Sequence, residues 1–217
     1  MTLTPCRIPL GYWSIPLTSE DTKLSTDVSP YIPGAWPYFL QALNWAQSYS
    51  LNTIVDIHGA PGSQNGYDNS GQRTQPPMWA ANQSNVQKTV DCVTFLAKNV
   101  GDKIDVLEVM NEPAGFLGDN FTDVLRQYYI DAYDAIRAEA GNMGVMLSDG
   151  FRGLDVSTPT EISLPNHWLN SPHSIGETPS MLLNTREHRW TLYVFSFCLI
   201  SELSLKITIK AHVPNLQ

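Results

Sequence analysis

Two apolar runs in this sequence end in residues that could carry out acid–base chemistry. Residues 105–110 lead directly into Asn111-Glu112-Pro113, and residues 52–57 lead in the same way into His58. An ionisable side chain at the end of a buried run is poorly suited to packing, whereas parallel barrels place catalytic side chains at the carboxyl ends of their strands. Taken singly, Glu112 could cap the next helix and His58 could be a satisfied core histidine. Together they indicate an α/β enzyme whose site collects strand ends.

Strands and helices alternate regularly from residue 7 to residue 152. Hydrophobic periodicity predicts strands at 6–13, 52–58, 105–110 and 144–148, and helices at 36–50, 85–100 and 121–140. Parallel strands need crossover helices, and this order supplies them. We therefore predict that residues 1–155 form an α/β domain with a parallel sheet. In residues 156–217 the alternation fails, and we treat them as a divergent C-terminal segment.

The loop that follows His58 is long and polar. It reads Gly59-Ala-Pro-Gly-Ser-Gln-Asn-Gly-Tyr-Asp-Asn-Ser-Gly71. Loops of this length inside a compact domain are usually functional. We therefore expect it to border the site that His58 and Glu112 form.

The composition restricts the class of partner. The chain has 217 residues, which suffices for one domain, although a complete eight-stranded α/β barrel takes about 250. Its net charge of −8 argues against nucleic-acid and anionic-membrane partners, which select clustered Lys and Arg, and fits a neutral substrate. No apolar run approaches the roughly 20 residues of a membrane span.

The cysteines and the glycosylation signals bear on cofactors and location. Cys6, Cys92 and Cys198 form no CxxC motif, so we expect neither a metal site nor another cofactor. The N-glycosylation sequons at Asn82 and Asn120 weakly favour a secreted protein. The N-terminus, however, lacks the charged and apolar regions of a signal peptide.

Three segments of the sequence form a distinctive set. They are Arg7-Ile-Pro-Leu-Gly-Tyr-Trp13, the stretch from Asp56 through the loop to Gly71, and Glu108-Val-Met-Asn-Glu-Pro113. Together they resemble fungal exo-β-1,3-glucanases of glycoside hydrolase family 5. The resemblance covers about residues 6–155. It implies a (β/α)8 TIM barrel, retaining hydrolysis of β-1,3-glucan or its oligosaccharides, and an extracellular or cell-wall location. The complete loop favours the exo-β-1,3 branch over endo-β-1,6-glucanases and glucosylceramide or steryl-glucoside hydrolases.

The resemblance also implies roles for individual residues. Glu112 is similar to the general acid/base, and Asn111 to the residue that binds the sugar 2-hydroxyl and positions the nucleophile. Arg7 would hold the nucleophile carboxylate in its ionised form. His58 would contact the glucose at the non-reducing end. A retaining mechanism needs one protonated and one ionised carboxyl, and burial at a strand end would raise the pKa of Glu112.

Further substrate contacts are expected around this centre. Aromatic rings can serve as platforms for the apolar faces of sugars, although each ring could equally be an ordinary core or rim residue. The expected substrate-binding residues, besides His58, are Tyr12, Trp13, Asn65, Tyr67, Asp68 and Phe151.

The sequence departs from the family pattern in its outer strands. Strands 2 to 5 of a barrel are clear, but strands 1, 7 and 8 are not found, so we expect an incomplete barrel with two open edges. The seventh strand should carry the nucleophile in a Gly-Glu-Trp-Ser-like motif, which this sequence lacks. Glu177 and Glu202 are poor substitutes, because their neighbours and spacing differ. The nucleophile is therefore not identified.

Three interpretations remain for the chain as a whole. It is a β-glucan hydrolase by family, inactive as it stands because the nucleophile is missing; or a glucan-binding pseudoenzyme; or a non-functional fragment whose residues 156–217 are non-native sequence.

Overall fold

Four parallel strands form the centre of the computed structural model, which describes residues 5–151 and 180–183. They pair in chain order and are β1 (Cys6–Gly11), β2 (Thr53–Gly59), β3 (Val106–Glu108) and β4 (Gly144–Ser148). The parallel sheet predicted from the sequence is confirmed. The strand predicted at 105–110 is shorter, although Val109 N and Asn111 N still donate to the carbonyls of Met146 and Ile57, at 3.1 and 3.0 Å.

A fifth strand lies beside β4. β5 (Ser180–Leu183) pairs antiparallel with β4, so the described sheet is open at β1 and at β5, as expected for an incomplete barrel with two open edges. The sequence analysis assigned no strand there, because the surrounding segment lacks periodicity. The rest of the predicted C-terminal segment lies outside the described residues.

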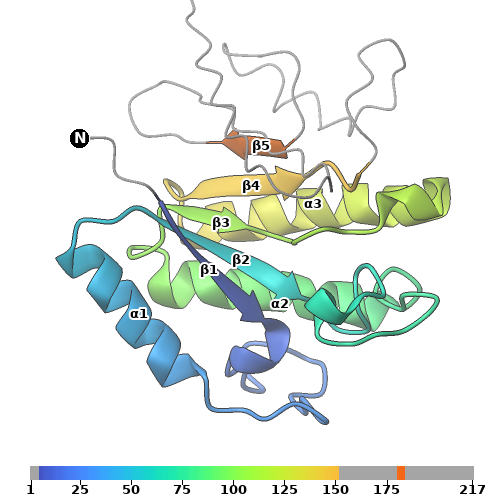
Figure 1. The fold of residues 1–217 in the computed structure, drawn as a ribbon, viewed down its shortest axis with the longest axis horizontal. Coiled ribbons are helices and arrows are strands. Elements are labelled where there is room, and N and C mark those ends of the chain that lie inside the picture. The colour runs from blue at the N-terminus through green and yellow to red at the C-terminus, as the bar shows by residue number, and fades with distance from the viewer. Residues whose placement is uncertain (1–4, 152–179, 184–217) are drawn as a thin grey trace, which may run out of the picture.

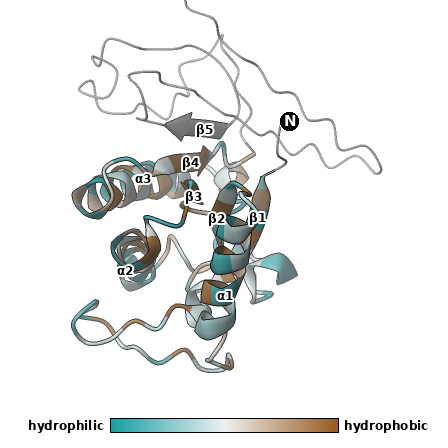
Figure 2. Ribbon diagram, turned by 90° about the vertical axis from the view of Figure 1, so that its left-hand side faces the viewer, coloured by the Kyte–Doolittle hydropathy of each residue, from teal (hydrophilic) through white to brown (hydrophobic). Residues whose placement is uncertain are grey.

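Three helices form the second layer. They are α1 (Trp36–Ser48), α2 (Gln83–Val100) and α3 (Asp119–Glu139), and each end lies within two residues of its predicted position. α2 begins earlier than predicted because the Asn82 side chain caps it, accepting a 3.0 Å hydrogen bond from Ser84 N. α2 and α3 lie side by side against the sheet in both views (Figures 1 and 2).

The two faces of the sheet differ in chemistry, because successive side chains of a strand point to opposite faces. Val55, Ile57 and Leu107 are fully buried in the hydrophobic core with the helices. Asp56 and Glu108 alternate with them and are partners in the register between β2 and β3. Two acidic side chains therefore lie next to each other on the face away from the helices.

Two tyrosines of α3 fix the carboxyl ends of β3 and β4. Tyr128 donates a 2.6 Å hydrogen bond to the carbonyl of Val109, and Tyr129 donates one of 2.8 Å to that of Ser148. Both rings are fully buried, and this burial raises the pKa of each phenol well above its usual value. The strand ends are thus held from the helix side at the edge where the candidate site lies.

Within the described parts of the chain, no helix combines the length and hydrophobicity needed to span a membrane.

Candidate active site

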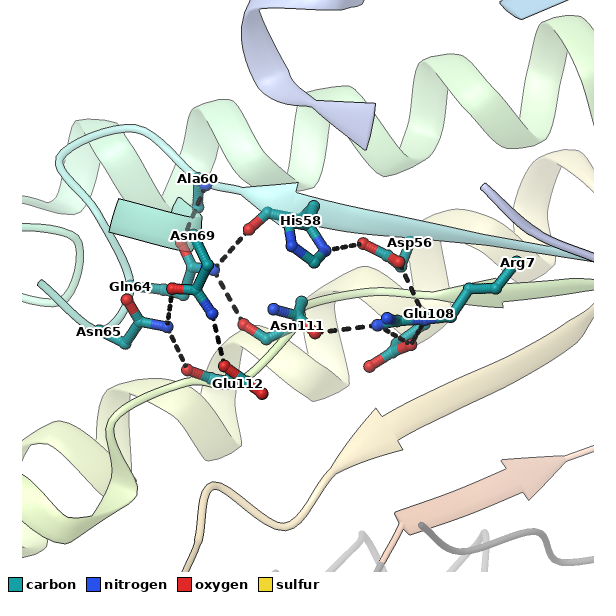
Figure 3. A network of polar contacts seen from close by, with 10 residues as sticks. All are labelled: Arg7, Asp56, His58, Ala60, Gln64, Asn65, Asn69, Glu108, Asn111 and Glu112. Atoms are coloured by element: carbon teal, nitrogen blue, oxygen red, sulfur yellow. Dashed lines mark hydrogen bonds and ion pairs between the residues drawn. The ribbon is translucent and has the colours of Figure 1, made fainter. Parts of the chain in front are cut away.

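Arg7 reaches the candidate site from an unexpected position. It is the second residue of β1 and pairs in register with Ile54, so it lies near the start of the strand, whereas His58 and Glu112 lie at or beyond strand ends. Its long side chain nevertheless extends along the sheet face, and Nη2 donates a 2.9 Å hydrogen bond to Asn111 Oδ1 (Figure 3). Arg7 and Asn111 are therefore brought together by the length of the arginine side chain.

Two buried carboxylates surround Arg7, and neither was among the site residues predicted from the sequence. Glu108 Oε2 accepts hydrogen bonds from Arg7 Nε and Nη2, at 3.2 and 2.9 Å. Asp56 is fully buried, and its Oδ2 lies 3.0 Å from Arg7 Nε as an ion pair. The signal was present in the sequence: acidic residues inside apolar strands need a cation within reach.

Burial dominates the electrostatics of Glu108. It raises the pKa of this carboxyl to about 7, against the opposing effect of the Arg7 guanidinium, while the neighbouring Asp56 raises it further. The sequence analysis assigned a desolvated carboxyl to Glu112, which is only half-buried. The carboxyl that burial affects most here is Glu108.

His58 is oriented by the same network. Its Nδ1 lies 3.0 Å from Asp56 Oδ1, and the two residues share a sheet face because they are two apart in β2. The imidazole side chain is 31% exposed. Since Nδ1 is engaged by Asp56, Nε2 is the ring nitrogen left for another partner.

Gln64 joins the loop to the ends of β2 and β3. Its side chain is fully buried, and Nε2 donates to the carbonyls of His58 and Asn111, at 2.9 and 2.8 Å. Its Oε1 accepts a 3.0 Å hydrogen bond from Ala60 N. A single amide therefore fixes the spacing between the two strand ends that carry the predicted site residues.

Two further amides of the loop hold Glu112. Asn69 Nδ2 donates to the Glu112 carboxylate Oε2 at 2.5 Å, and Asn65 Nδ2 donates to the Glu112 backbone carbonyl at 3.0 Å. Asn65 was predicted to contact substrate, but it is only 1% exposed and its Oδ1 accepts from Tyr67 N at 2.9 Å. In this structure the Asn65 amide supports the backbone of Glu112.

The backbone of Glu112 is itself in an unusual conformation. Its φ of 47° lies in the left-handed region, which costs about 1–3 kcal/mol for a residue with a side chain. Pro113 follows it, and the contacts from Asn65 and Asn69 hold the strained residue in place. Such strain persists where the surrounding structure fixes one orientation of a side chain.

Trp13, an expected sugar platform, has one face of its ring covered by another aromatic residue. Its ring stacks on Tyr31, with centroids 4.0 Å apart and planes 10° from parallel. A Cβ atom at Gly11, Gly59 or Gly71 would lie 2.2–2.7 Å from the ring, so its edge fits among three glycines. Trp13 therefore anchors the loop against the end of β1.

Tyr12 belongs to the same aromatic cluster. Its ring packs edge-on against Trp13 and Tyr31, at 5.4 and 5.7 Å, and Lys88 Nζ lies 5.3 Å from its centroid. Burial, first of all, raises the pKa of Tyr12 to about 12. These contacts assign Tyr12 to packing, which was the alternative weighed for each predicted aromatic platform.

The remaining predicted contacts lie at the surface. Tyr67 is 49% exposed and Phe151 is 37% exposed, with the Phe151 ring 6.1 Å from that of Phe116. Asp68 forms a 3.0 Å ion pair with Arg73, both side chains being largely exposed. The nucleophile candidates Glu177 and Glu202 lie outside the described residues. In the part that is described, no group of three or more His, Cys, Asp or Glu side chains is arranged to hold a metal ion.

Comparisons with known proteins agree with this arrangement. Residues 23–184 match the family described as Cellulase (glycosyl hydrolase family 5). Glucan 1,3-beta-glucosidase 2 of Wickerhamomyces anomalus is 33% identical over 167 residues, which cover 75% of this chain and 36% of that protein. Probable glucan 1,3-beta-glucosidase A of Aspergillus fumigatus is 37% identical over 148 residues, which cover 67% of this chain and 33% of that protein.

The chain thus spans roughly a third of the length of these two relatives. Among solved structures, the rutinosidase from Aspergillus niger superimposes with a TM-score of 0.56 at 20% identity, over 69% of this chain and 44% of that one. At that identity the likeness concerns the fold, and it agrees with β1–β4 as part of a TIM barrel. The chain belongs to glycosyl hydrolase family 5.

Proposed function

We propose that this site binds the terminal glucose of a β-1,3-glucan and that Glu112 is the general acid/base of a retaining glycosidase. The observation that carries the proposal is Asn111 Nδ2, a buried donor without a hydrogen-bond partner among the described residues. Leaving such a donor unpaired costs about 1–3 kcal/mol, which a sugar hydroxyl beside Glu112 would recover. The names of the relatives support glucan as the substrate.

The mechanism that we propose divides the work between two carboxyls. Glu112 protonates the leaving oxygen, and a carboxylate about 5–5.5 Å away attacks the sugar from the opposite face. Asp56 and Glu108 are poor candidates for this nucleophile, because both side chains are buried, Asp56 completely and Glu108 with 8% exposed. We therefore propose that the chain as it stands binds glucan without turning it over. Glucan is a wall polysaccharide, so we also propose an extracellular or cell-wall location.

Two measurements on residues 1–217 test this function. Calorimetric titration with laminaribiose should show saturable binding. Asn111→Ala should lower the affinity about tenfold, which corresponds to the loss of one hydrogen bond to a buried donor. Glu139→Gln on the exposed end of α3 is the matched control and should leave the affinity unchanged. Glucose release from laminarin should stay at the level of a blank.

The outcomes separate the candidate functions. Absence of laminaribiose binding by a cooperatively folded chain would contradict glucan binding. Turnover that disappears on mutating Glu177 or Glu202 would identify a nucleophile where we propose none. Binding without turnover is the expected result and is the behaviour of a glucan-binding pseudoenzyme.

A further inference from the structure

We infer that Glu108 is a positioning residue, which acts through Arg7 to fix the orientation of the Asn111 amide towards the ligand. The inference rests on the proposed function, because it assigns the presented amide to sugar binding. Arg7 bonds both Glu108 and Asn111, so Glu108 can influence the proposed ligand only through these two residues (Figure 3).

The first step concerns which end of the Asn111 amide faces Arg7. The guanidinium has only donors, so the Asn111 atom that lies 2.9 Å from Nη2 must be the acceptor Oδ1. The amide is planar, and Nδ2 therefore points away from Arg7. Arg7 thus selects one of the two amide orientations, and the selected one presents the buried, unpaired Nδ2 donor.

The second step concerns what orients Arg7. Nη2 has two protons, and it contacts Glu108 Oε2 and Asn111 Oδ1 at the same distance of 2.9 Å. Nε has one proton, which it donates to Glu108 at 3.2 Å. Glu108 therefore holds the guanidinium by two of its edge donors, and the remaining Nη2 proton is directed to Asn111.

The third step distinguishes Glu108 from Asp56, the other carboxylate beside Arg7. Asp56 divides its oxygens between Arg7 and His58, each at 3.0 Å. It would remain an ionic partner if Glu108 were neutralised, and it lies on the neighbouring strand. The guanidinium could then turn towards Asp56, and its bond to Asn111 would be lost. Glu108 is thus the carboxylate that determines where Nη2 points.

The energetics favour orientation over stability as the role of this cluster. Two buried carboxylates around one guanidinium are expensive to desolvate, and apolar residues of similar volume often stabilise a fold as well or better. Glu108 is 8% exposed and Asp56 is fully buried. The raised pKa of Glu108 is consistent with such a cost.

The decisive experiment reads the Asn111 amide directly, without a ligand. In the ¹⁵N spectrum of residues 1–217, the Asn111 side-chain signals are identified by their loss in Asn111→Asp. Wild type should give two well-separated NH₂ resonances, and Glu108→Gln should shift or broaden them while the backbone spectrum stays folded. Glu139→Gln is the matched control and should leave them in place. Unchanged Asn111 resonances in Glu108→Gln would overturn the inference.

A double-mutant cycle on laminaribiose affinity separates positioning from a merely structural role. Glu108→Gln alone should weaken binding about tenfold, or about 1.4 kcal/mol. In the Asn111→Ala background it should have no further effect, because the amide it orients is gone. Equal losses in both backgrounds would contradict the inference. If Glu108→Gln moves the amide but wild type binds no laminaribiose, the proposed function fails and the positioning role stands.

Discussion

Asn69 of the loop and Glu112 after β3 are joined by a 2.5 Å hydrogen bond between amide and carboxylate. The bond spans 43 residues of sequence and joins the loop after β2 to the segment after β3. It restrains the side chain of Glu112, while Asn65 restrains its backbone. The proposed acid is thus oriented by a loop that belongs to a different strand end.

Asn69→Ala should loosen the Glu112 side chain with little effect on stability. Asn69 is exposed, so its loss should change the free energy of unfolding by no more than about 0.5 kcal/mol. Laminaribiose affinity should fall by about threefold to tenfold, because a charge-assisted hydrogen bond no longer orders the site. Calorimetry measures this effect. Asn99→Ala, at an exposed position of α2, is the control; equal affinities for the two variants would contradict the prediction.

Glu108 should make the stability of the fold depend on pH. Its folded-state pKa of about 7 exceeds the unfolded value of 4.5, so the folded state binds the proton more tightly. The resulting stability is fully present below pH 4.5 and is lost as pH rises through 7. One pKa unit corresponds to about 1.4 kcal/mol, which gives a loss of about 3 kcal/mol. Urea unfolding at pH 5 and pH 8 should show this loss in wild type and a much smaller one in Glu108→Gln.

Gln64→Ala should be strongly destabilising. The substitution removes three hydrogen bonds of a fully buried amide and leaves the carbonyls of His58 and Asn111 without their donor. Each of the three buried groups left unpaired costs about 1–3 kcal/mol, so we expect a loss of at least about 3 kcal/mol in unfolding free energy. Gln127→Ala on the exposed face of α3 is the comparison and should stay within about 0.5 kcal/mol of wild type. A similar small change for Gln64→Ala would refute the joining role of Gln64.

Gly71 and Gly118 allow a test of the Trp13 anchor. Both have positive φ, 83° and 110°, so alanine is strained at either position. At Gly71 the new Cβ would also lie 2.2 Å from the Trp13 ring, whereas nothing lies within 4 Å at Gly118. Chemical denaturation should therefore show Gly71→Ala to be less stable than Gly118→Ala by about 1–3 kcal/mol, the range for overpacking. Equal losses would mean that Trp13 is free to move.

The predictable part of this molecule is the part that hydrophobic periodicity controls. The helix that begins near Trp36 and the strand that leads to His58 follow from local patterns, because one face of each must be buried. The cluster of Arg7, Asp56 and Glu108 does not, since its members are up to 101 residues apart and meet only through sheet register. The reach of the Arg7 side chain, which brings it to Asn111 from the start of β1, is likewise not visible in a pattern of residue types.

The predicted sugar platforms show a second limit of sequence patterns. The residue type alone does not show whether an aromatic side chain is exposed or packed. Only tertiary contacts distinguish the packed Trp13 from the exposed Tyr67. Tyr31, which covers one face of Trp13, lies in a loop without periodicity. Glycines 11, 59 and 71 are distant in sequence, so the space that they leave for the Trp13 ring arises only when β1 and β2 pair.

The antiparallel pairing of β5 has a consequence for barrel closure. A closed barrel would require a parallel strand beside β4, hydrogen-bonded to the same backbone groups that β5 now occupies from Val145 to Ser148. The two pairings exclude each other, because a strand edge has one set of donors and acceptors. β5 therefore prevents a parallel strand from pairing with β4, and a parallel strand that continues the barrel at this position must first displace it.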